Sequence, residues 1–285
     1  MKEAILPLLL KELRLPSIGQ FWESFQRQAT SENWTYGRYL AHLCEQELSE
    51  RHTRRLSRHM NQSRLPRGKS LESFNFSSCG LNRAEVIALA SEDSWVRSGK
   101  NVLIFGPSGV GKTHLAAAIG EQLVQQGVRV LFTRTTELVQ GLQQAKRELT
   151  LSATLDKLDK YDCIILDDFG YVKKSEQETT VLFELICERY ERRSLMLTCN
   201  QSFKDWDSIF SDKMMAVAAV DRLVHHALIL EVRGESYRRK AALERGGEPS
   251  APGAGPYVAS GESGRAARPS DFEKSSNSKK EEQVE

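Results

Sequence analysis

The sequence lacks any long, uninterrupted run of apolar residues. No segment of the 285 residues approaches the roughly 18 consecutive apolar residues of a transmembrane helix. The opening segment, MKEAILPLLLKELR, is interrupted by Pro7 and reaches Lys11 and Glu12 without a small-residue cleavage site, unlike a secretory signal peptide. We therefore expect an amphipathic helix at this end, a cytoplasmic protein and no membrane partner.

Paired cysteines and a strong charge bias are also missing. The five cysteines are odd in number and form no C-x-x-C pair, which argues against a disulfide framework or a cysteine zinc site. The net charge is only +2, so any surface for nucleic acid must come from local clustering of cations. Apolar residues make up 40% of the chain, which is enough for a packed core.

The most informative stretch is KNVLIFGPSGVGKT, from Lys100 to Thr113. Its apolar run, VLIF, has the length of a buried strand, and the sequence after Thr113 is typical of a helix. A strand, a glycine-rich turn and a helix in this order match the phosphate-binding pattern G-x-x-x-x-G-K-[ST]. The nucleotide-binding residues predicted from this pattern are Gly106, Pro107, Ser108, Gly109, Val110, Gly111, Lys112 and Thr113.

The chemistry of this turn predicts ATP and Mg²⁺ as cofactors. Its glycines let backbone N–H groups approach an anion, and the following helix adds the positive end of its dipole. Lys112 supplies a positive charge for the β and γ phosphates, and Thr113 supplies a hydroxyl for Mg²⁺.

An acidic motif follows downstream in YDCIILDDFG, where an apolar run ends in Asp167 and Asp168. A carboxylate at the carboxyl end of a strand beside the phosphate-loop strand can bind Mg²⁺, and we assign this to Asp167. Asp168 is expected to orient or deprotonate the attacking water. A later strand, SLMLTCN, ends in Asn200, whose amide suits either the γ-phosphate and its water or a turn cap.

Apolar runs of strand length alternate with helical segments between residues 67 and 245. This alternation predicts an α/β domain, with a five-stranded parallel sheet flanked by helices. A small all-helical domain is expected at 1–66. The segment at 64–76, with Pro66 and Gly68 as breakers, is expected to be an extended linker into the second domain. Residues 246–285 are rich in Gly, Ser, Pro and charge, so we expect a disordered tail. The His225–His226 pair lacks metal-ligand spacing, and we expect it to be structural.

Three helices are expected in residues 1–66. The first is marked by leucines from Leu6 to Leu13, the second by a capping box of Ser17 and Gln20, and the third begins near Tyr36. The aromatic residues that these spacings place in a shared core are Phe21, Trp22, Phe25, Tyr36 and Tyr39.

The third helix is expected to continue past Glu50, where its character changes. Four arginines, Arg51, Arg54, Arg55 and Arg58, follow at i, i+3, i+4 and i+7 and continue the face of Leu40 and Cys44. The pairs Glu47–Arg51 and Glu50–Arg54 fit a solvated face, but they leave Arg55 and Arg58 without helical partners. Contact with the phosphates of duplex DNA is the alternative that we favour.

Several motifs together resemble one known family. The phosphate loop, IILDDFGYV, ERYERRSLMLTCNQSFKDW, VDRLVHH and GESYR occur in the order seen in the IstB-like ATPases, which LLLKELRLPSI near the start also resembles. These are transposition helpers of insertion sequences, related to the DnaC helicase loaders within the AAA+ class. The resemblance covers roughly residues 5–245 and implies a P-loop AAA+ fold with ATPase activity.

The resemblance also implies roles for three residues. Asn200 would be the sensor-1 residue, Arg222 the arginine finger that reaches a neighbouring subunit's ATP, and Arg238 the sensor-2 arginine. Two features depart from the wider class. Many AAA+ proteins have Glu where this chain has Asp168, so hydrolysis is expected to be slow. Little chain follows Arg239 to form the helical lid of larger members.

The family implies ATP-dependent oligomerisation on duplex DNA and recruitment of a partner transposase, with hydrolysis resetting the assembly. A DnaC-like replicative helicase loader is the alternative function. A metabolic P-loop kinase is a third class, but no second phosphate-acceptor pocket is recognisable in the sequence.

Overall fold

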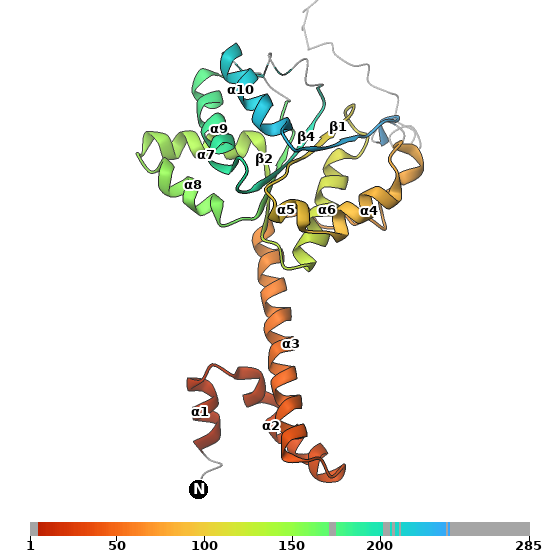
Figure 1. Cartoon of the computed structure of the whole chain (residues 1–285), viewed down its shortest axis with the longest axis vertical. Coiled ribbons are helices and arrows are strands. Elements are labelled where there is room, and N and C mark those ends of the chain that lie inside the picture. Colours follow the sequence, from red (N-terminus) through yellow and green to blue (C-terminus); the bar gives the residue numbers. More distant parts are fainter. Residues whose placement is uncertain are drawn as a thin grey trace, which may run out of the picture. The chain divides into compact units, whose positions relative to one another are not determined.

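The computed structural model describes residues 5–170, 175–201, 206, 209–210, 212–237 and 239. A five-stranded parallel sheet forms its centre (Figure 1). The strands are β1(Val102–Phe105), β2(Val130–Arg134), β3(Cys163–Asp167), β4(Ser194–Cys199) and β5(Leu228–Glu231). Their spatial order is β2-β3-β4-β1-β5. The predicted α/β class, with five parallel strands, is confirmed.

Helices cover both faces of the sheet, as Figure 1 shows. One face carries α4(Arg83–Ser91), α5(Ser94–Arg97) and α6(Lys112–Gln125), which enclose one apolar core with β1. The other carries α7(Thr135–Arg147), α8(Leu151–Asp159), α9(Glu176–Arg189) and α10(Lys213–Val224), which enclose a second core. The central strands are buried on both sides, which explains their continuous apolar sequences.

A buried arginine ties the second layer to the sheet. Arg189, at the end of α9, is only 1% exposed. Its guanidinium donates hydrogen bonds to the carbonyl oxygens of Leu158, Tyr161 and Ser194. Burial lowers the pKa of Arg189 to about 10, still far above neutral, so the side chain stays charged. Carbonyl oxygens accept hydrogen bonds from both of its terminal nitrogens.

The chain begins with α1(Leu6–Glu12), α2(Pro16–Ser31) and the long α3(Tyr36–Ser63). The expected capping box at Ser17 is wrong, because α2 starts at Pro16 and has no side-chain cap of its own. A carboxylate from α3 takes that role: Glu47 Oε2 accepts hydrogen bonds from the backbone N–H groups of Ser17 and Ile18 at 2.8 and 3.1 Å. Negative charge at a helix N-terminus is stabilising.

The core of these three helices is smaller than the sequence pattern indicates. Leu10, Ile18 and Leu43 are buried, with Trp22, Phe25 and Tyr39 packed around them. Tyr36 is 94% exposed, so its expected place in this core is wrong. Leu40 and Cys44, which lie on the face that the arginines continue, are also exposed.

The end of α3 and the segment after it pack against the side of the sheet that carries α4, α5 and α6. Met60 and Leu65 lie against the first apolar core, and Leu71 and Phe74 are buried in it. The segment at 64–76, expected as an extended linker, is therefore part of this packing. The division at residues 66 and 67 stays a prediction, and the tail at 246–285 lies outside the described residues. No helix among those described is long and apolar enough to cross a membrane.

Candidate functional site

The glycine-rich turn follows β1 and leads directly into α6, whose first residue is Lys112. Gly106 and Gly111 have φ angles of 153° and 101°, which favour glycine. A Cβ at Gly106 would lie 2.2 Å from the carbonyl oxygen of Val232, and one at Gly111 would lie 3.1 Å from the Phe74 ring. The turn is thus held between two other segments, with the N–H groups of the first turn of α6 beside it.

The ammonium group of Lys112 is held inside the turn. Its Nζ donates to the carbonyl oxygens of Gly106 and Pro107, both at 2.8 Å, and the residue is 8% exposed. A buried ammonium group is costly unless it is bonded. The fold therefore holds a positive charge at the position where the sequence motif requires one.

Asp167 ends β3 and is 4% exposed. Its carboxylate accepts hydrogen bonds from Thr113 Oγ1 at 2.9 and 3.1 Å and from Thr198 Oγ1 at 2.6 Å. Burial raises the pKa of Asp167, while the bonds from Thr198 and Thr113 lower it in part. A hydroxyl beside a buried carboxylate is a donor set that suits a hard cation such as Mg²⁺. The sequence analysis did not predict a role for Thr198. Its position near the end of β4, the strand that pairs with β3, could have indicated its contact with Asp167.

Asp168 and Asn200 both lie at the same edge of the sheet as the turn. Asp168 has a φ angle of 56°, its side chain is exposed, and its backbone N–H donates to Thr198 Oγ1 at 3.0 Å. Asn200 directly follows β4, which lies between β1 and β3, and is also exposed. Both side chains are therefore open to a ligand at the carboxyl ends of the strands.

Arg222 lies away from this edge. Nδ2 of Asn101 lies 3.5 Å from the carbonyl oxygen of Arg222 and 3.1 Å from that of Leu223. Asn101 is the residue before β1, whereas the glycine-rich turn follows the other end of this strand. The guanidinium of Arg222 stands 5.4 and 5.9 Å from the ring centroids of Phe183 and Tyr190. Arg238 lies outside the described residues.

The segment at 64–76, which the sequence analysis treated as a linker, lies against the start of α6 and the glycine-rich turn. His114 Nε2 is 3.0 Å from the carbonyl oxygen of Ser70, and its ring meets Phe74 edge-on with centroids 5.3 Å apart. Burial lowers the pKa of His114. The apolar residues of SLESFNF, the sequence that carries this packing, were the signal that could have revealed it.

The arginine stripe of α3 divides into two pairs. Arg51 Nε donates to Glu47 Oε1 at 2.7 Å, confirming that predicted pair, and Arg54 Nη2 donates to Ser17 Oγ at 2.7 Å. The predicted Glu50–Arg54 ion pair is wrong, because Arg54 Nε bonds the backbone oxygen of Glu50 and its guanidinium turns toward α2.

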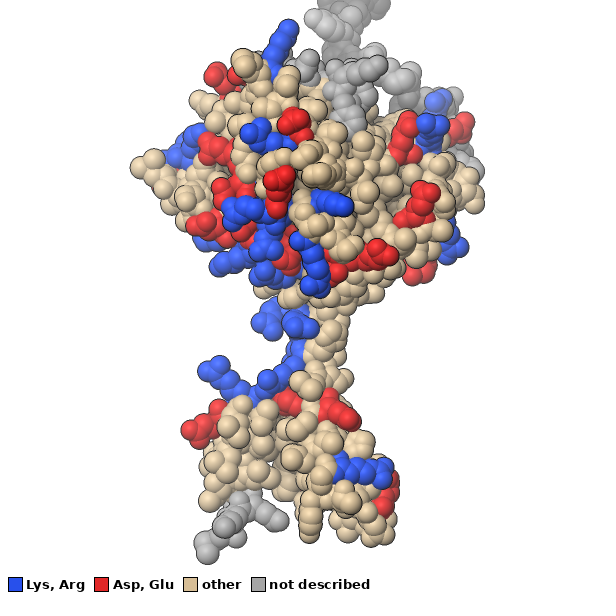
Figure 2. All heavy atoms as spheres, viewed as in Figure 1, with Lys and Arg blue, Asp and Glu red and all other residues tan. Residues whose placement is uncertain are grey.

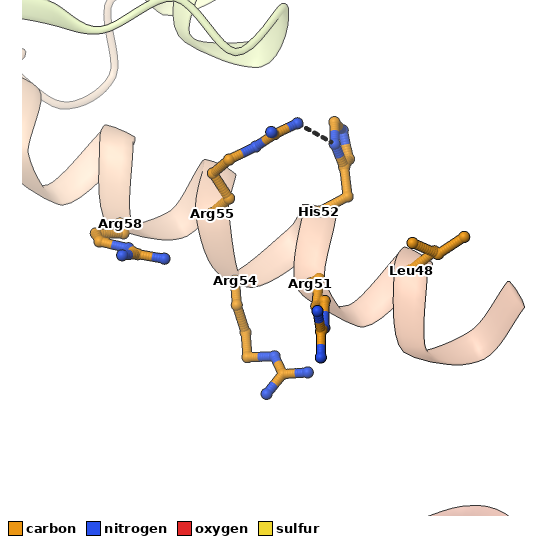
Figure 3. A pocket seen from close by; sticks show the side chains of 6 residues that line it. All are labelled: Leu48, Arg51, His52, Arg54, Arg55 and Arg58. Atoms are coloured by element: carbon orange, nitrogen blue, oxygen red, sulfur yellow. Dashed lines mark hydrogen bonds between the residues drawn. The ribbon is translucent and has the colours of Figure 1, made fainter. Parts of the chain in front are cut away.

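The other two arginines stay free of acidic partners. Arg55 Nη2 lies 3.2 Å from Nδ1 of His52, and within the part of the chain that the structure describes no carboxylate pairs with Arg55 or Arg58. Arg51, His52, Arg54, Arg55 and Arg58 line one pocket on α3. Figure 3 shows the side chains of Arg55 and His52 pointing away from those of Arg51 and Arg54. Figure 2 shows basic side chains, in blue, along this part of α3.

A parallel sheet in the order β2-β3-β4-β1-β5, with a glycine-rich turn after β1 and an acidic residue at the end of β3, defines a P-loop ATPase of the AAA+ class. Within that class the chain belongs to the family of IstB-like ATP binding proteins, whose model matches residues 8–245. It is thus an ATP-binding protein of the kind that insertion sequences encode.

Relatives and solved structures agree with this assignment. An insertion sequence ATP-binding protein of Sinorhizobium fredii is 54% identical over 85% of this chain and 82% of its own length. The IS21 ATP-binding protein of Pseudomonas aeruginosa is 38% identical over 85% of this chain and 91% of its own. The DnaC helicase loader has the same fold, with a TM-score of 0.50 and 19% identity over 59% of this chain and 98% of that one.

Proposed function

We propose that this chain is an ATP-dependent DNA-binding helper of transposition. Bound ATP would join copies of the chain on duplex target DNA, and the assembly would recruit or stimulate a partner transposase. The proposal rests on two observations. Lys112 and Asp167 lie beside the glycine-rich turn, and Arg55 and Arg58 on α3 have no carboxylate partner among the described residues. Membership of the insertion sequence family supports the same context.

Each residue of the ATP site has a distinct proposed role. The N–H groups of residues 106–113 and the Lys112 ammonium would hold the phosphates. Thr113 and Asp167 would hold Mg²⁺, which neutralises charge on the transferring phosphoryl group when bound. Asp168 would orient the attacking water, and Asn200 would contact the γ-phosphate or that water. Arg238 is proposed as the sensor-2 residue on the family resemblance alone.

Arg222 would act on the ATP of a neighbouring subunit. The four residues of β1 span about 13 Å at roughly 3.3 Å per residue, and Arg222 lies at the opposite end of this strand from the glycine-rich turn. Phosphates bound at the turn of the same subunit would therefore be beyond the reach of the Arg222 side chain. The ATP site is therefore completed only in an oligomer.

We expect Arg222→Ala to leave ATP affinity within about twofold of wild type and to reduce turnover by roughly 10³-fold, the lower end for a missing arginine finger. Titration calorimetry with a non-hydrolysable ATP analogue and a phosphate-release assay measure the two quantities. Addition of a Lys112→Ala chain, which keeps Arg222 but lacks a working site, should restore part of the turnover. Loss of ATP binding in Arg222→Ala would mean that this arginine serves its own subunit.

The DNA surface would be centred on Arg55 and Arg58. Four like charges on one helix repel each other unless counter-charges are near, and Glu47 serves only Arg51 and Arg54. The phosphates of a duplex are the counter-charges proposed for the remaining pair. Removal of the γ-phosphate by hydrolysis would loosen the subunit interface and release the DNA.

The deciding experiment measures duplex binding by fluorescence anisotropy with Mg²⁺ and either the ATP analogue or ADP, alongside electron microscopy of the complexes. We expect tight binding and ordered oligomers only with the analogue. Preference for single-stranded DNA together with a stable complex with a hexameric helicase would instead identify a helicase loader. Stimulation of turnover by a small-molecule phosphate acceptor would identify a kinase.

A further inference from the structure

Two histidines and a glutamate meet at the junction of α9 and α10. His225 is the C-terminal cap of α10, and His226 follows it with a φ angle of 60°. This turn brings the two imidazole rings to a centroid distance of 3.8 Å. Glu191, just after α9, approaches the pair, with Oε1 3.7 Å from His225 Nδ1. We propose that Glu191, His225 and His226 form a binding site for a divalent transition-metal ion such as Zn²⁺.

The spacing of the three side chains suits such an ion. One ligand atom from each residue lies within 4.8 Å of the other two. Nitrogen and oxygen ligands of tetrahedral zinc are about 3.3 Å apart, given bond lengths of roughly 2.0–2.1 Å. All three side chains are exposed, so small side-chain rotations close the remaining gap without moving the backbone.

The chemistry of the cluster favours an imidazole-binding metal over Mg²⁺ or Ca²⁺. Neutral imidazole suits Zn²⁺, Ni²⁺ and Cu²⁺, whereas Mg²⁺ and Ca²⁺ prefer oxygen ligands alone. Tyr190 Oη lies 2.7 Å from Nδ1 of His225. It can accept a hydrogen bond from the Nδ1–H group, which leaves Nε2 free to bind the metal, as outer-shell partners of metal-bound histidines do. Three protein ligands leave one tetrahedral position for water or a neighbouring molecule.

The sequence alone did not indicate this site, because two adjacent histidines lack metal-ligand spacing. The third ligand, Glu191, precedes β4 in the sequence, whereas the two histidines follow it. A bound ion would tie the end of α10 to the turn after α9. Arg222 lies one helical turn before His225, and its guanidinium stands over Tyr190. Metal binding would therefore restrict the segment that carries Arg222; this last consequence rests on the proposed function, whereas the site itself does not.

The test is titration calorimetry of Zn²⁺ into the full chain, without nucleotide or DNA and with excess Mg²⁺ to occupy oxygen sites. We expect one Zn²⁺ per chain. His226→Asn should weaken binding at least about tenfold, and asparagine tolerates the positive φ angle at this position. Tyr190→Phe should weaken binding by roughly tenfold, because it removes the outer-shell partner of His225.

The matched control is His42→Ala. His42 Nδ1 also lies near a carboxylate, 3.5 Å from Glu45 Oε2, but His42 is not part of the three-residue cluster. Its removal should leave the affinity unchanged. Thermal melting without metal checks that each variant is folded, and the Zn²⁺-induced rise in melting temperature should disappear only in His226→Asn. Absence of saturable binding, an unchanged affinity in His226→Asn, or an equal loss in His42→Ala would overturn the site.

Discussion

Asp167 and Arg58 are both charged side chains in proposed binding surfaces, but their surroundings differ. Asp167 is 4% exposed and bonded to two threonine hydroxyls. Lys112, nearby, is 8% exposed and bonded to two carbonyl oxygens. Arg58 is exposed, and no carboxylate pairs with it among the residues that the structure describes.

This difference separates two ways of binding phosphate. Buried charges at fixed positions cost desolvation energy when the protein folds, but they need little reorganisation when the ligand arrives. Exposed arginines cost little, and their attraction for phosphate is screened by salt. The ATP site is therefore expected to be specific and sensitive to single substitutions. The arginine surface is expected to act through the sum of its charges.

The largest effect on ATP affinity is expected from Lys112→Ala. Loss of a charged hydrogen-bonding group worth about 3 kcal/mol corresponds to a decrease of roughly 100-fold in ATP affinity. Nucleotide-dependent oligomers should disappear as well. Titration calorimetry and sedimentation measure the two outcomes. Lys100→Ala, which removes an exposed lysine just before β1, is the matched control. Normal oligomers from Lys112→Ala would disprove the proposed ATP switch.

Glu47→Gln should separate the structural role of Arg51 and Arg54 from the proposed DNA-binding role of Arg55 and Arg58. Glu47 is 3% exposed and bonds the start of α2 as well as Arg51. Loss of its charge should cost about 1–3 kcal/mol of stability, measured by chemical denaturation. DNA affinity per folded molecule should change little. A stability equal to that of wild type would mean that the carboxylate does not anchor these helices.

The same carboxylate predicts a pH dependence. Burial alone would raise the pKa of Glu47, but hydrogen bonds from Arg51, Ile18 and Ser17 lower it overall. A lowered pKa contributes stability above the unfolded value of about 4.3, and that stability is lost as pH falls through the folded value. Glu47→Gln should remove this part of the acid destabilisation below about pH 4.3. Identical acid melting profiles would contradict the assignment.

Arg55→Ala combined with Arg58→Ala tests the exposed half. If both side chains contact phosphate, the slope of log affinity against log salt should flatten by roughly two units, with stability unchanged. Arg97→Ala combined with Arg192→Ala, which removes two exposed arginines paired with Asp93 and Glu188, controls for net charge. An unchanged slope would mean that the stripe is only a solvated face.

The smallest effect is expected from Asp167→Asn. Burial raises the pKa of Asp167, so the folded state loses stability as pH rises through that pKa and the carboxylate ionises. The variant should therefore melt a few degrees higher without nucleotide at neutral pH. It should gain little from Mg²⁺ and ATP, whereas wild type is stabilised by them. Scanning calorimetry in both conditions decides; a lower melting temperature would mean that the carboxylate contributes net stability.

The sequence alone determined the order of strands and helices and the phosphate-binding turn. Glycines at set positions, Lys112 and an apolar strand before them act over a few residues, so their spacing predicts the local geometry. The apolar run before Asp167 likewise predicted β3. Its expected place directly beside the phosphate-loop strand is wrong, because β4 lies between β3 and β1. Family membership, too, follows from the sequence.

Only the tertiary structure decided which distant residues complete each site. It brought Thr198 to Asp167 and Glu47 to the start of α2, and it set Arg222 at the far end of β1 from the glycine-rich turn. It also joined Glu191 to His225 and left Tyr36 in solvent. The physical reason is that a local motif is specified by its immediate neighbours, whereas contacts between distant residues depend on how the helices pack on the sheet.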